Sequence, residues 1–247
     1  MSVSHKRTVI AWEKVRAVIF DVDGTLYNQR SLRLLMLRDL IMYYFMHSSC
    51  WKDLLILHAF RRFRENMAER SQGDGEIYKI QCQLTAVKLG VSVKRVEACV
   101  ANWIMSHPLQ YLKSVQFPGI LEFCRSLEAA SIKLAAFSDY PAEEKLKVLG
   151  FPNMLTVCSV DKEVNCLKPD PKGLLFAARK LSVPVDACLL IGDRDNRDGE
   201  CARRIDMPYL IKTRYSSRPN HFRCYGDLHE EFNKVRGRLE WDNISIS

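Results

Sequence analysis

The chain has 247 residues, of which 47% are apolar and 27% are charged, and its formal net charge is +8. This composition is ordinary for a globular protein, and the length allows one large domain or one domain with a smaller insertion. The longest lipid-like run, residues 40–46, is far too short to cross a bilayer, which excludes a transmembrane segment. The positive charge suits an anionic substrate, nucleic acid or an acidic membrane surface without choosing among them.

The first predicted element is a strand at residues 15–20, which ends in two aspartates. The sequence continues as Asp21-Val22-Asp23-Gly24-Thr25-Leu26. Side chains two residues apart share a face of an extended chain, so the carboxylates of Asp21 and Asp23 can converge. Two close carboxylates repel each other unless a proton or a cation lies between them, and Mg²⁺ prefers oxygen ligands. The pair therefore indicates Mg²⁺ as the first cofactor to consider.

The segment of residues 29–116 is predicted to be an all-helical insertion. From residue 31 to about residue 68 apolar side chains recur at helical spacing, and residues 71–75 interrupt the pattern. Further helices are expected at residues 77–89 and 93–105. The segment contains 13 Lys and Arg against 7 Asp and Glu, so most of the net charge lies in it. One apolar stripe of its first helix is traced by Leu34, Leu37, Arg38, Ile41, Tyr44 and Phe45.

The rest of the chain alternates between predicted strands and helices, which is typical of a doubly wound parallel sheet. The strands are expected at residues 132–137, 155–159, 187–191 and 209–211. The helices are expected at residues 141–149, from Asp170 as the N-cap to about residue 181, and at residues 198–205. The tail after Lys212 shows less pattern. We therefore predict an α/β protein with a Rossmann-like core, residues 1–28 and 117–247, and a helical cap, residues 29–116.

The nine cysteines are irregularly spaced, and none of them form a Cys-x-x-Cys pair. An odd number without a framework favours a reducing compartment, and apolar runs around Cys124 and Cys188 are typical of small buried side chains. No zinc site is apparent. The N-terminal residues lack the long apolar stretch of a secretory signal peptide, so we expect a cytoplasmic protein.

Polar side chains follow several of the predicted strands. Besides Asp21 and Asp23, they are Ser138, Lys168, Asp193 and Asp198. Ligands of such sheets bind beyond the carboxyl ends of the strands, so these side chains are expected to meet. Carboxylates can hold Mg²⁺, a lysine can neutralise phosphate, and a serine can donate a hydrogen bond. The set suits phosphoryl transfer, which needs a nucleophile, cations on the phosphoryl oxygens and a proton for the leaving alkoxide.

These residues resemble the four ordered motifs of the haloacid dehalogenase (HAD) superfamily. The first motif is residues 21–26, and the others are Ser138, Lys168-Pro169, and Gly192-Asp193 with Asp198. The resemblance spans about residues 15–28 and 117–211. It implies that the helical insertion is a C1 cap, as in the phosphoglycolate-phosphatase-like and β-phosphoglucomutase-like branches. Gly192-Asp193-Arg194 followed by Asp198-Gly199 resembles the phosphatase branch in particular.

The resemblance also implies a role for each motif residue. Asp21 would be the nucleophile that forms an aspartyl phosphate, and Asp23 would be the general acid and base. Dehalogenases of the superfamily carry an aromatic residue at the position of Asp23 and need no metal, so Asp23 implies phosphate chemistry.

The remaining motif residues would bind the metal and the phosphoryl group. Mg²⁺ would be held by Asp21, by the backbone carbonyl of Asp23 and by Asp193, with Asp198 as a ligand or as a support of the ligands. Ser138 and Lys168 would hold the transferring phosphoryl group.

The leading hypothesis is a Mg²⁺-dependent phosphatase that hydrolyses a small anionic phosphomonoester. One alternative is a phosphotransferase or mutase of the β-phosphoglucomutase type, which returns the phosphoryl group to a sugar. Another is a non-catalytic binding protein that uses its positive charge on nucleic acid or a membrane surface. A nucleic-acid partner is not expected, because no nucleic-acid motif or continuous basic helix occurs. The oligomeric state is left open.

Each candidate residue also has a purely structural alternative. Aspartates at strand ends can serve as turn or cap residues, Ser138 could cap the next helix, and Lys168 could lie in a solvated loop. Asp139 fits a local turn as well as a site. The arginines of the insertion either lie on a solvated face or bind an anionic substrate; they are Arg61, Arg62 and Arg64. Its large apolar side chains are expected to pack, and its histidines to be structural; they are Met36, Met42, Tyr43, Tyr44 and Trp51, and His47, His58 and His107.

Overall fold

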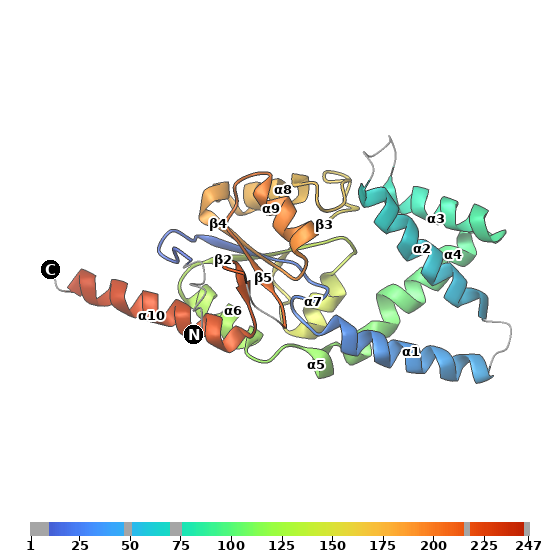
Figure 1. The fold of residues 1–247 in the computed structure, drawn as a ribbon, viewed down its shortest axis with the longest axis horizontal. Coiled ribbons are helices and arrows are strands. Elements are labelled where there is room, and N and C mark those ends of the chain that lie inside the picture. Colours follow the sequence, from blue (N-terminus) through green and yellow to red (C-terminus); the bar gives the residue numbers. More distant parts are fainter. Residues whose placement is uncertain (1–9, 47–50, 70–75, 215–217, 245–247) are drawn as a thin grey trace, which may run out of the picture.

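A six-stranded parallel sheet, in the order β3-β2-β1-β4-β5-β6, forms the centre of the protein (Figure 1). The computed structural model describes residues 10–46, 51–69, 76–214 and 218–244. The strands are β1 Ala17–Phe20, β2 Lys133–Ser138, β3 Leu155–Cys158, β4 Cys188–Gly192, β5 Tyr209–Lys212 and β6 His221–Phe222. The predicted α/β fold with a doubly wound parallel sheet is confirmed.

Helices cover both faces of the sheet, so its strands are apolar on both sides. Val18 and Phe20 of β1 belong to the apolar cluster beneath α6 and α10, whereas Ala17 and Ile19 belong to the cluster beneath α8 and α9. Figure 1 shows these two pairs of helices on opposite sides of the sheet. The helices of this part are α6 Ile120–Ala129, α7 Glu143–Leu149, α8 Lys172–Leu181, α9 Glu200–Arg203 and α10 Tyr225–Ile244.

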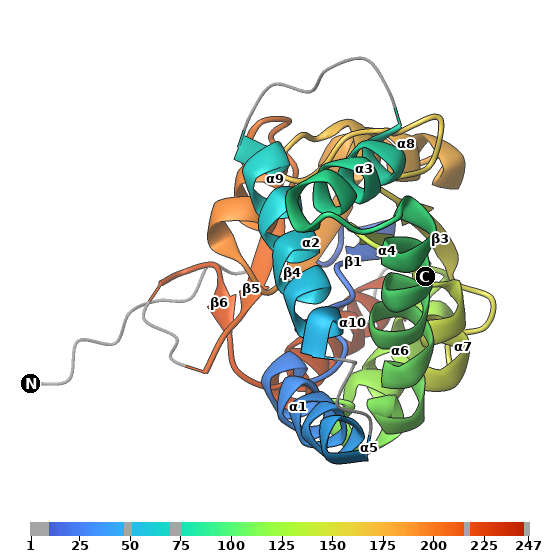
Figure 2. The same ribbon diagram turned by 90° about the vertical axis from the view of Figure 1, so that its right-hand side faces the viewer.

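Several details differ from the sequence-based expectation. The N-cap of α8 is Pro171, while the Asp170 carboxylate accepts a hydrogen bond from the Lys172 N–H at 2.9 Å. The helix expected at residues 198–205 begins earlier, as a π-helical turn Asp195–Gly199 that leads into α9. The tail after Lys212 contains β6 at the edge of the sheet and the long helix α10 (Figure 2).

The insertion is helical, as predicted, and has an apolar cluster of its own around Ile56, Phe60 and Val96. Its α-helices are α1 Gln29–Met46, α2 Trp51–Glu69, α3 Ile77–Leu89, α4 Val93–Val100 and α5 Leu112–Val115. A π-helical segment Ala101–Ser106 and a 3₁₀ helix His107–Tyr111 join the last two. Residues 71–75, the predicted break, lie outside the described residues.

The two connections between the sheet and the insertion lie side by side. The Asn28 N–H donates to the Val115 carbonyl at 2.8 Å, and the Phe117 N–H donates to the Leu26 carbonyl at 3.1 Å. Both segments are therefore fixed to each other next to the end of β1.

The apolar stripe of α1 is exposed rather than buried. Leu34, Leu37, Ile41 and Phe45 expose 69%, 48%, 45% and 88% of their surface, whereas Leu40 is buried in the insertion. Within the part of the chain that the structure describes, no helix is long and apolar enough to cross a membrane.

Candidate active site

The site is built at the carboxyl end of β1, where Asp21 follows the last residue of the strand. The Asp21 N–H still donates to the Ile191 carbonyl of β4 at 2.8 Å, which fixes the backbone at this point. Its carboxylate is buried and accepts hydrogen bonds from Lys168 Nζ at 2.6 Å and from Thr25 Oγ1 at 3.0 Å. Burial, opposed by the attraction of Lys168, raises the pKa of Asp21 to about 6.

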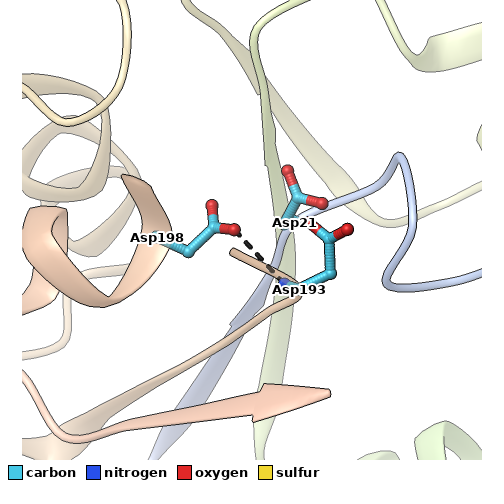
Figure 3. Close-up of side chains that lie close together, drawn as sticks. All are labelled: Asp21, Asp193 and Asp198. Carbon is cyan, nitrogen blue, oxygen red and sulfur yellow. Dashed lines mark hydrogen bonds between the residues drawn. The ribbon is translucent and has the colours of Figure 1, made fainter. Parts of the chain in front are cut away.

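Asp193 and Asp198 complete an acidic triad with Asp21 at the end of β4 (Figure 3). One carboxylate oxygen of each residue lies within 4.8 Å of the others. The Asp198 carboxylate accepts hydrogen bonds from the Asp193 N–H at 3.2 Å and the Arg194 N–H at 3.0 Å. The turn Asp195–Gly199 therefore holds Asp198 in place against the strand end.

The triad has the properties of a site for a hard cation. Burial and the repulsion from Asp21 and Asp198 raise the pKa of Asp193 to about 8. Asp193 Oδ1 is buried and accepts no hydrogen bond from the described residues. At Gly24, where φ is +102°, a Cβ atom would collide with the Asp193 carboxylate, so the chain leaves this space to the acidic oxygens. The residues present thus fit Mg²⁺, which takes carboxylate and carbonyl oxygens as ligands.

Lys168 is the buried cation that the structure places against Asp21 and Asp198. Its Nζ lies 2.6 Å from Asp21 Oδ1 and 2.8 Å from Asp198 Oδ1, and the side chain is 1% exposed. Arg194 Nε lies 3.8 Å from Asp193 Oδ1. Burial alone would lower the pKa of Lys168, but the carboxylates of Asp198 and Asp21 raise it above its usual range. Burial alone would likewise raise the pKa of Asp198, but Lys168 holds it below its usual range. The alternative of a solvated loop lysine is wrong.

Asp23 has a separate set of partners. Asp23 Oδ1 accepts hydrogen bonds from Lys145 Nζ at 2.6 Å and from the Tyr27 hydroxyl. Burial alone would raise the pKa of Asp23, but Lys145 and Tyr27 lower it. Asp21 and Asp23 therefore do not share one environment: the first belongs to the triad, and the second is held by α7 and by the chain after β1.

Ser138 and Asp139 lie at the end of β2, on the same edge of the sheet as the triad. Ser138 is 2% exposed, and its Oγ accepts a hydrogen bond from the Tyr140 N–H at 3.2 Å. The Asp139 carboxylate accepts hydrogen bonds from Ser159 Oγ at 2.8 Å and from the Lys168 N–H at 3.3 Å. Asp139 thus supports the loop that carries Lys168, so its role extends beyond a local turn.

One arginine of the insertion connects it to the loop after β2. Arg64 is 3% exposed, donates to the Asp139 carbonyl and to Gln81 Oε1, and stacks over the Tyr140 ring at 3.9 Å. A solvated face is therefore wrong for Arg64, whereas Arg61 and Arg62 are exposed.

A cavity of about 430 Å³ opens above these residues, between the sheet and the insertion. Asp21, Asp23 and Ser138 form its polar floor. The insertion contributes polar, charged and apolar side chains, which are Gln29, Arg33, His58, Arg61, Arg64, Glu65, Leu32, Met36, Leu37, Leu40, Leu54, Leu57, Trp103, Ile104 and Pro108. The cavity has the size and the mixed lining of a small-molecule site.

The structure thus brings four of the six predicted site residues together, as the triad and Lys168, and places Asp23 and Ser138 on the cavity floor. Lys145 and Tyr27 were missed. Nothing in the sequence distinguishes Lys145 from Lys147, two positions further along the same helix, because their difference lies in which side of α7 faces the cavity.

The other side chains of the insertion have mixed outcomes. Met36 is partly buried against the apolar clusters, as expected, but Met42 is 60% exposed. His107 Nε2 lies at hydrogen-bond distance, 2.8 Å, from Asp39 Oδ2, which agrees with the structural role expected for it. His58, in contrast, lines the cavity. The positions that lie outside the described residues or side chains are Tyr44, His47 and Trp51.

Comparisons with known proteins agree with this arrangement. A family model described as haloacid dehalogenase-like hydrolase matches residues 15–206. The chain is 26% identical over 196 residues to the glyceraldehyde 3-phosphate phosphatase of Methanopyrus kandleri, covering 78% of this chain and 82% of that protein. It is 24% identical over 193 residues to the phosphoglycolate phosphatase of Colwellia psychrerythraea, covering 74% and 78%.

A solved structure, a 2-haloacid dehalogenase from Pseudomonas syringae pv. Tomato, is similar with a TM-score of 0.60 at 16% identity. The match covers 90% of this chain and 99% of that chain. At this identity the similarity concerns the fold alone.

Proposed function

Because the chain belongs to the haloacid dehalogenase-like hydrolase family, we propose that it is a Mg²⁺-dependent phosphatase that hydrolyses a small phosphomonoester through a phosphorylated aspartate. The observation that carries the proposal is the separation of its two neighbouring carboxylates. Asp21 lies in the triad with Lys168, and Asp23 lies outside it with Lys145. Such a pair supplies one nucleophile and one group that is free to move protons.

In the first step an oxygen of Asp21 attacks phosphorus, the bond between phosphorus and the alcohol oxygen breaks, and a protonated Asp23 gives its proton to the leaving alkoxide. Against the effect of burial, Lys145 and Tyr27 lower the pKa of Asp23, so its protonation requires the opposing effect of the negatively charged substrate phosphate bound beside it. In the second step Asp23 takes a proton from a water molecule whose oxygen attacks phosphorus. The bond to Asp21 then breaks, and phosphate and the free carboxylate are released. Covalent catalysis of this kind divides one difficult displacement into two easier ones.

Asp21, Asp193 and the backbone carbonyl of Asp23 would hold Mg²⁺, with Asp198 as a further ligand or as a support for Asp193. The ion would reduce the repulsion between the carboxylate nucleophile and a phosphate dianion. Lys168 and Ser138 are proposed to hold the phosphoryl group, since both reach the floor of the cavity or the nucleophile itself.

The helical insertion is proposed to act as a cap over a core formed by residues 1–28 and 117–247. Its two connections are bonded to each other beside β1, which suits a pair of hinge segments. Arg64 and the loop after β2 would then form and break contact as the cap moves. Cytoplasmic location is also a proposal, supported by the eight free cysteines among the described residues, most of them buried.

The proposal is tested by phosphate release from p-nitrophenyl phosphate and a panel of metabolite phosphates, with and without Mg²⁺. We expect Mg²⁺-dependent turnover that Asp21→Asn abolishes together with any acid-stable labelled phosphoenzyme. Asp23→Asn should slow turnover strongly while Mg²⁺ binding persists, because only its backbone carbonyl would contact the ion. Turnover by Asp21→Asn equal to that of the parent would refute the mechanism. An isomerised sugar phosphate in place of free phosphate would instead indicate a mutase.

A further inference from the structure

We infer that the preferred substrate is a phosphomonoester of an apolar alcohol, one whose leaving group carries a hydrocarbon chain. The inference rests on the proposed phosphatase function and concerns the part of the cavity that faces away from the reacting carboxylates. Three observations support it: the apolar side chains that line the cavity, the hydrogen bonds that already occupy some of its polar side chains, and the exposed apolar side chains of α1 beside its rim.

The cavity is divided into a polar floor and an apolar wall. The floor is formed by the ends of β1 and β2, with Asp21 and Ser138. The wall is formed mainly by α1, α2 and the segment Ala101–Ser106, whose apolar contribution is Leu32, Met36, Leu37, Leu40, Leu54, Leu57, Trp103 and Ile104. The same two helices also contribute polar or charged side chains, which are Gln29, Arg33, His58, Arg61, Arg64 and Glu65. A phosphoryl group on the floor therefore directs the rest of its ester toward hydrocarbon.

Several polar side chains of the cavity are already engaged with protein partners. Lys145 is bonded to Asp23, and Arg64 is bonded to Gln81 and to the Asp139 carbonyl. Arg33 and Arg61 also line the cavity and suit the charge of an incoming phosphate. The hydroxyl groups of a sugar placed against the eight apolar side chains, away from His58, Glu65 and the arginines, would lose water without gaining equivalent hydrogen bonds, which is unfavourable. A hydrocarbon chain there loses only unfavourable contact with water.

The apolar wall continues onto the outer surface. Leu37 and Leu54 line the cavity and yet expose 48% and 39% of their surface, so they form its rim. Beyond them, Leu34 and Ile41 of α1 and Leu55 of α2 expose 69%, 45% and 42%. Contiguous exposed apolar surface is unfavourable in water and commonly marks a binding site. On α1, Leu34, Leu37 and Ile41 recur at helical spacing on one face, and Leu37 also lines the cavity, so a chain too long for the cavity can lie along α1.

The expected size of the effect follows from the burial of methylene groups. Complete burial of one methylene corresponds to about a fourfold gain in affinity, and a chain that remains half in contact with water gains about twofold per methylene. Between ethyl and hexyl phosphate, kcat/KM should therefore rise by roughly 16-fold or more if each added methylene contacts the wall.

The test compares linear alkyl phosphates from ethyl to octyl, below their micelle concentrations, with glycerol 3-phosphate and 2-phosphoglycolate. Binding of the matching alkylphosphonates with Mg²⁺ present is measured by calorimetry. We expect kcat/KM and affinity to rise with chain length. Hydrolysis of the polar esters with a flat alkyl series would overturn the inference and leave the phosphatase function intact. Phosphonate affinity that rises with chain length, without turnover of any ester, would support the inference and refute the phosphatase function.

Variants connect the effect to the apolar wall. Leu37→Gln and Leu54→Gln should each reduce the ratio of hexyl to ethyl phosphate kcat/KM by several-fold, since both change the rim of the cavity. Leu84→Gln is the matched control, because Leu84 lies on α3 of the insertion, is 40% exposed and does not line the cavity. The control should keep the parent ratio. An equal reduction in all three variants, or none in the rim variants, would contradict the inference.

Discussion

Replacing Lys145 by methionine tests whether this buried lysine acts through Asp23. The substitution keeps the length of the side chain and removes the ammonium group that lies 2.6 Å from Asp23 Oδ1. Lys147 provides a matched control on the same helix, because its Nζ pairs with Glu144 and its side chain is 56% exposed.

The magnitude follows from the burial of the ion pair. The side chains of Lys145 and Asp23 are 6% and 19% exposed, and the loss of one partner from a buried pair is strongly destabilising. Asp23 faces the cavity and keeps its bond to Tyr27, so we expect a lower loss of about 2 kcal/mol in the free energy of unfolding. For a chain of this size, that corresponds to a fall in Tm of roughly 4 to 8 °C.

The substitution should also lower kcat. General acid–base catalysis contributes about 10²- to 10⁴-fold, and a carboxylate that is no longer held in place loses part of it. We expect Lys145→Met to lower kcat about ten- to a hundredfold with less change in KM. Lys145→Arg should restore part of the loss, and Lys147→Met should resemble the parent in both kcat and Tm.

A double-mutant cycle distinguishes positioning from direct action on the substrate. If Lys145 acts through Asp23, Lys145→Met should change kcat less than about twofold in an Asp23→Asn background. The same ten- to hundredfold loss in both backgrounds would refute the reasoning. A similar loss in Lys147→Met would also refute it, because the effect would then belong to the charge of α7 rather than to the ion pair.

Three further predictions concern the proposed Mg²⁺ site, the loop after β1 and the cysteines. Gly24→Ala should weaken Mg²⁺ binding at least about tenfold in calorimetry, because φ is positive at Gly24 and the added Cβ would collide with the Asp193 carboxylate. Gly90→Ala is the control and should keep the parent affinity, because a Cβ at Gly90 meets open space. Equal Mg²⁺ affinities of the two variants would contradict the assignment of the triad as the Mg²⁺ site. Tyr225→Phe removes the buried hydrogen bond of 2.9 Å from the Tyr225 hydroxyl to the Thr25 carbonyl in the loop after β1. It should lower the free energy of unfolding in urea by about 1 kcal/mol. An unchanged urea midpoint would show that this hydrogen bond does not stabilise the fold. Burial raises the pKa of the Cys158 thiol to about 12, which leaves about one thiolate in ten thousand at pH 8. Iodoacetamide should therefore label the exposed Cys224 well before Cys158, as measured by mass spectrometry. Rapid labelling of Cys158 in the folded protein would be inconsistent with its burial.

The order of the sheet's elements was predictable because most strands are short apolar runs bounded by turn residues. β4, for example, is fully buried and ends at Gly192. The edge strand β6 has only two residues, too few for any period to appear, and the polar sequence of α10 hides the burial of Leu228 and Phe232 against the sheet. Helix starts were less accurate, since α7 begins at Glu143 rather than at residue 141.

The motif residues of the site were predictable because each follows a strand or its connection, and parallel strands place their carboxyl ends on one edge. Lys145 and Arg64 were not. Both are contributed by helices, and which side chain of a helix faces the cavity depends on tertiary packing. The apolar stripe of α1 shows the same limit: its period predicts the helix correctly but not that Leu34 and Phe45 remain exposed.

The central position of β1 has a consequence for biosynthesis. The strand is made first, but its neighbours β2 and β4 both come after the whole helical insertion. A strand with such distant partners must wait for them, because the entropy of closing a long loop is lost before the pairing is gained. Asp21, the proposed nucleophile, therefore leaves the ribosome long before the residues that would bind metal with it, and no N-terminal fragment that ends before β4 can assemble the acidic triad.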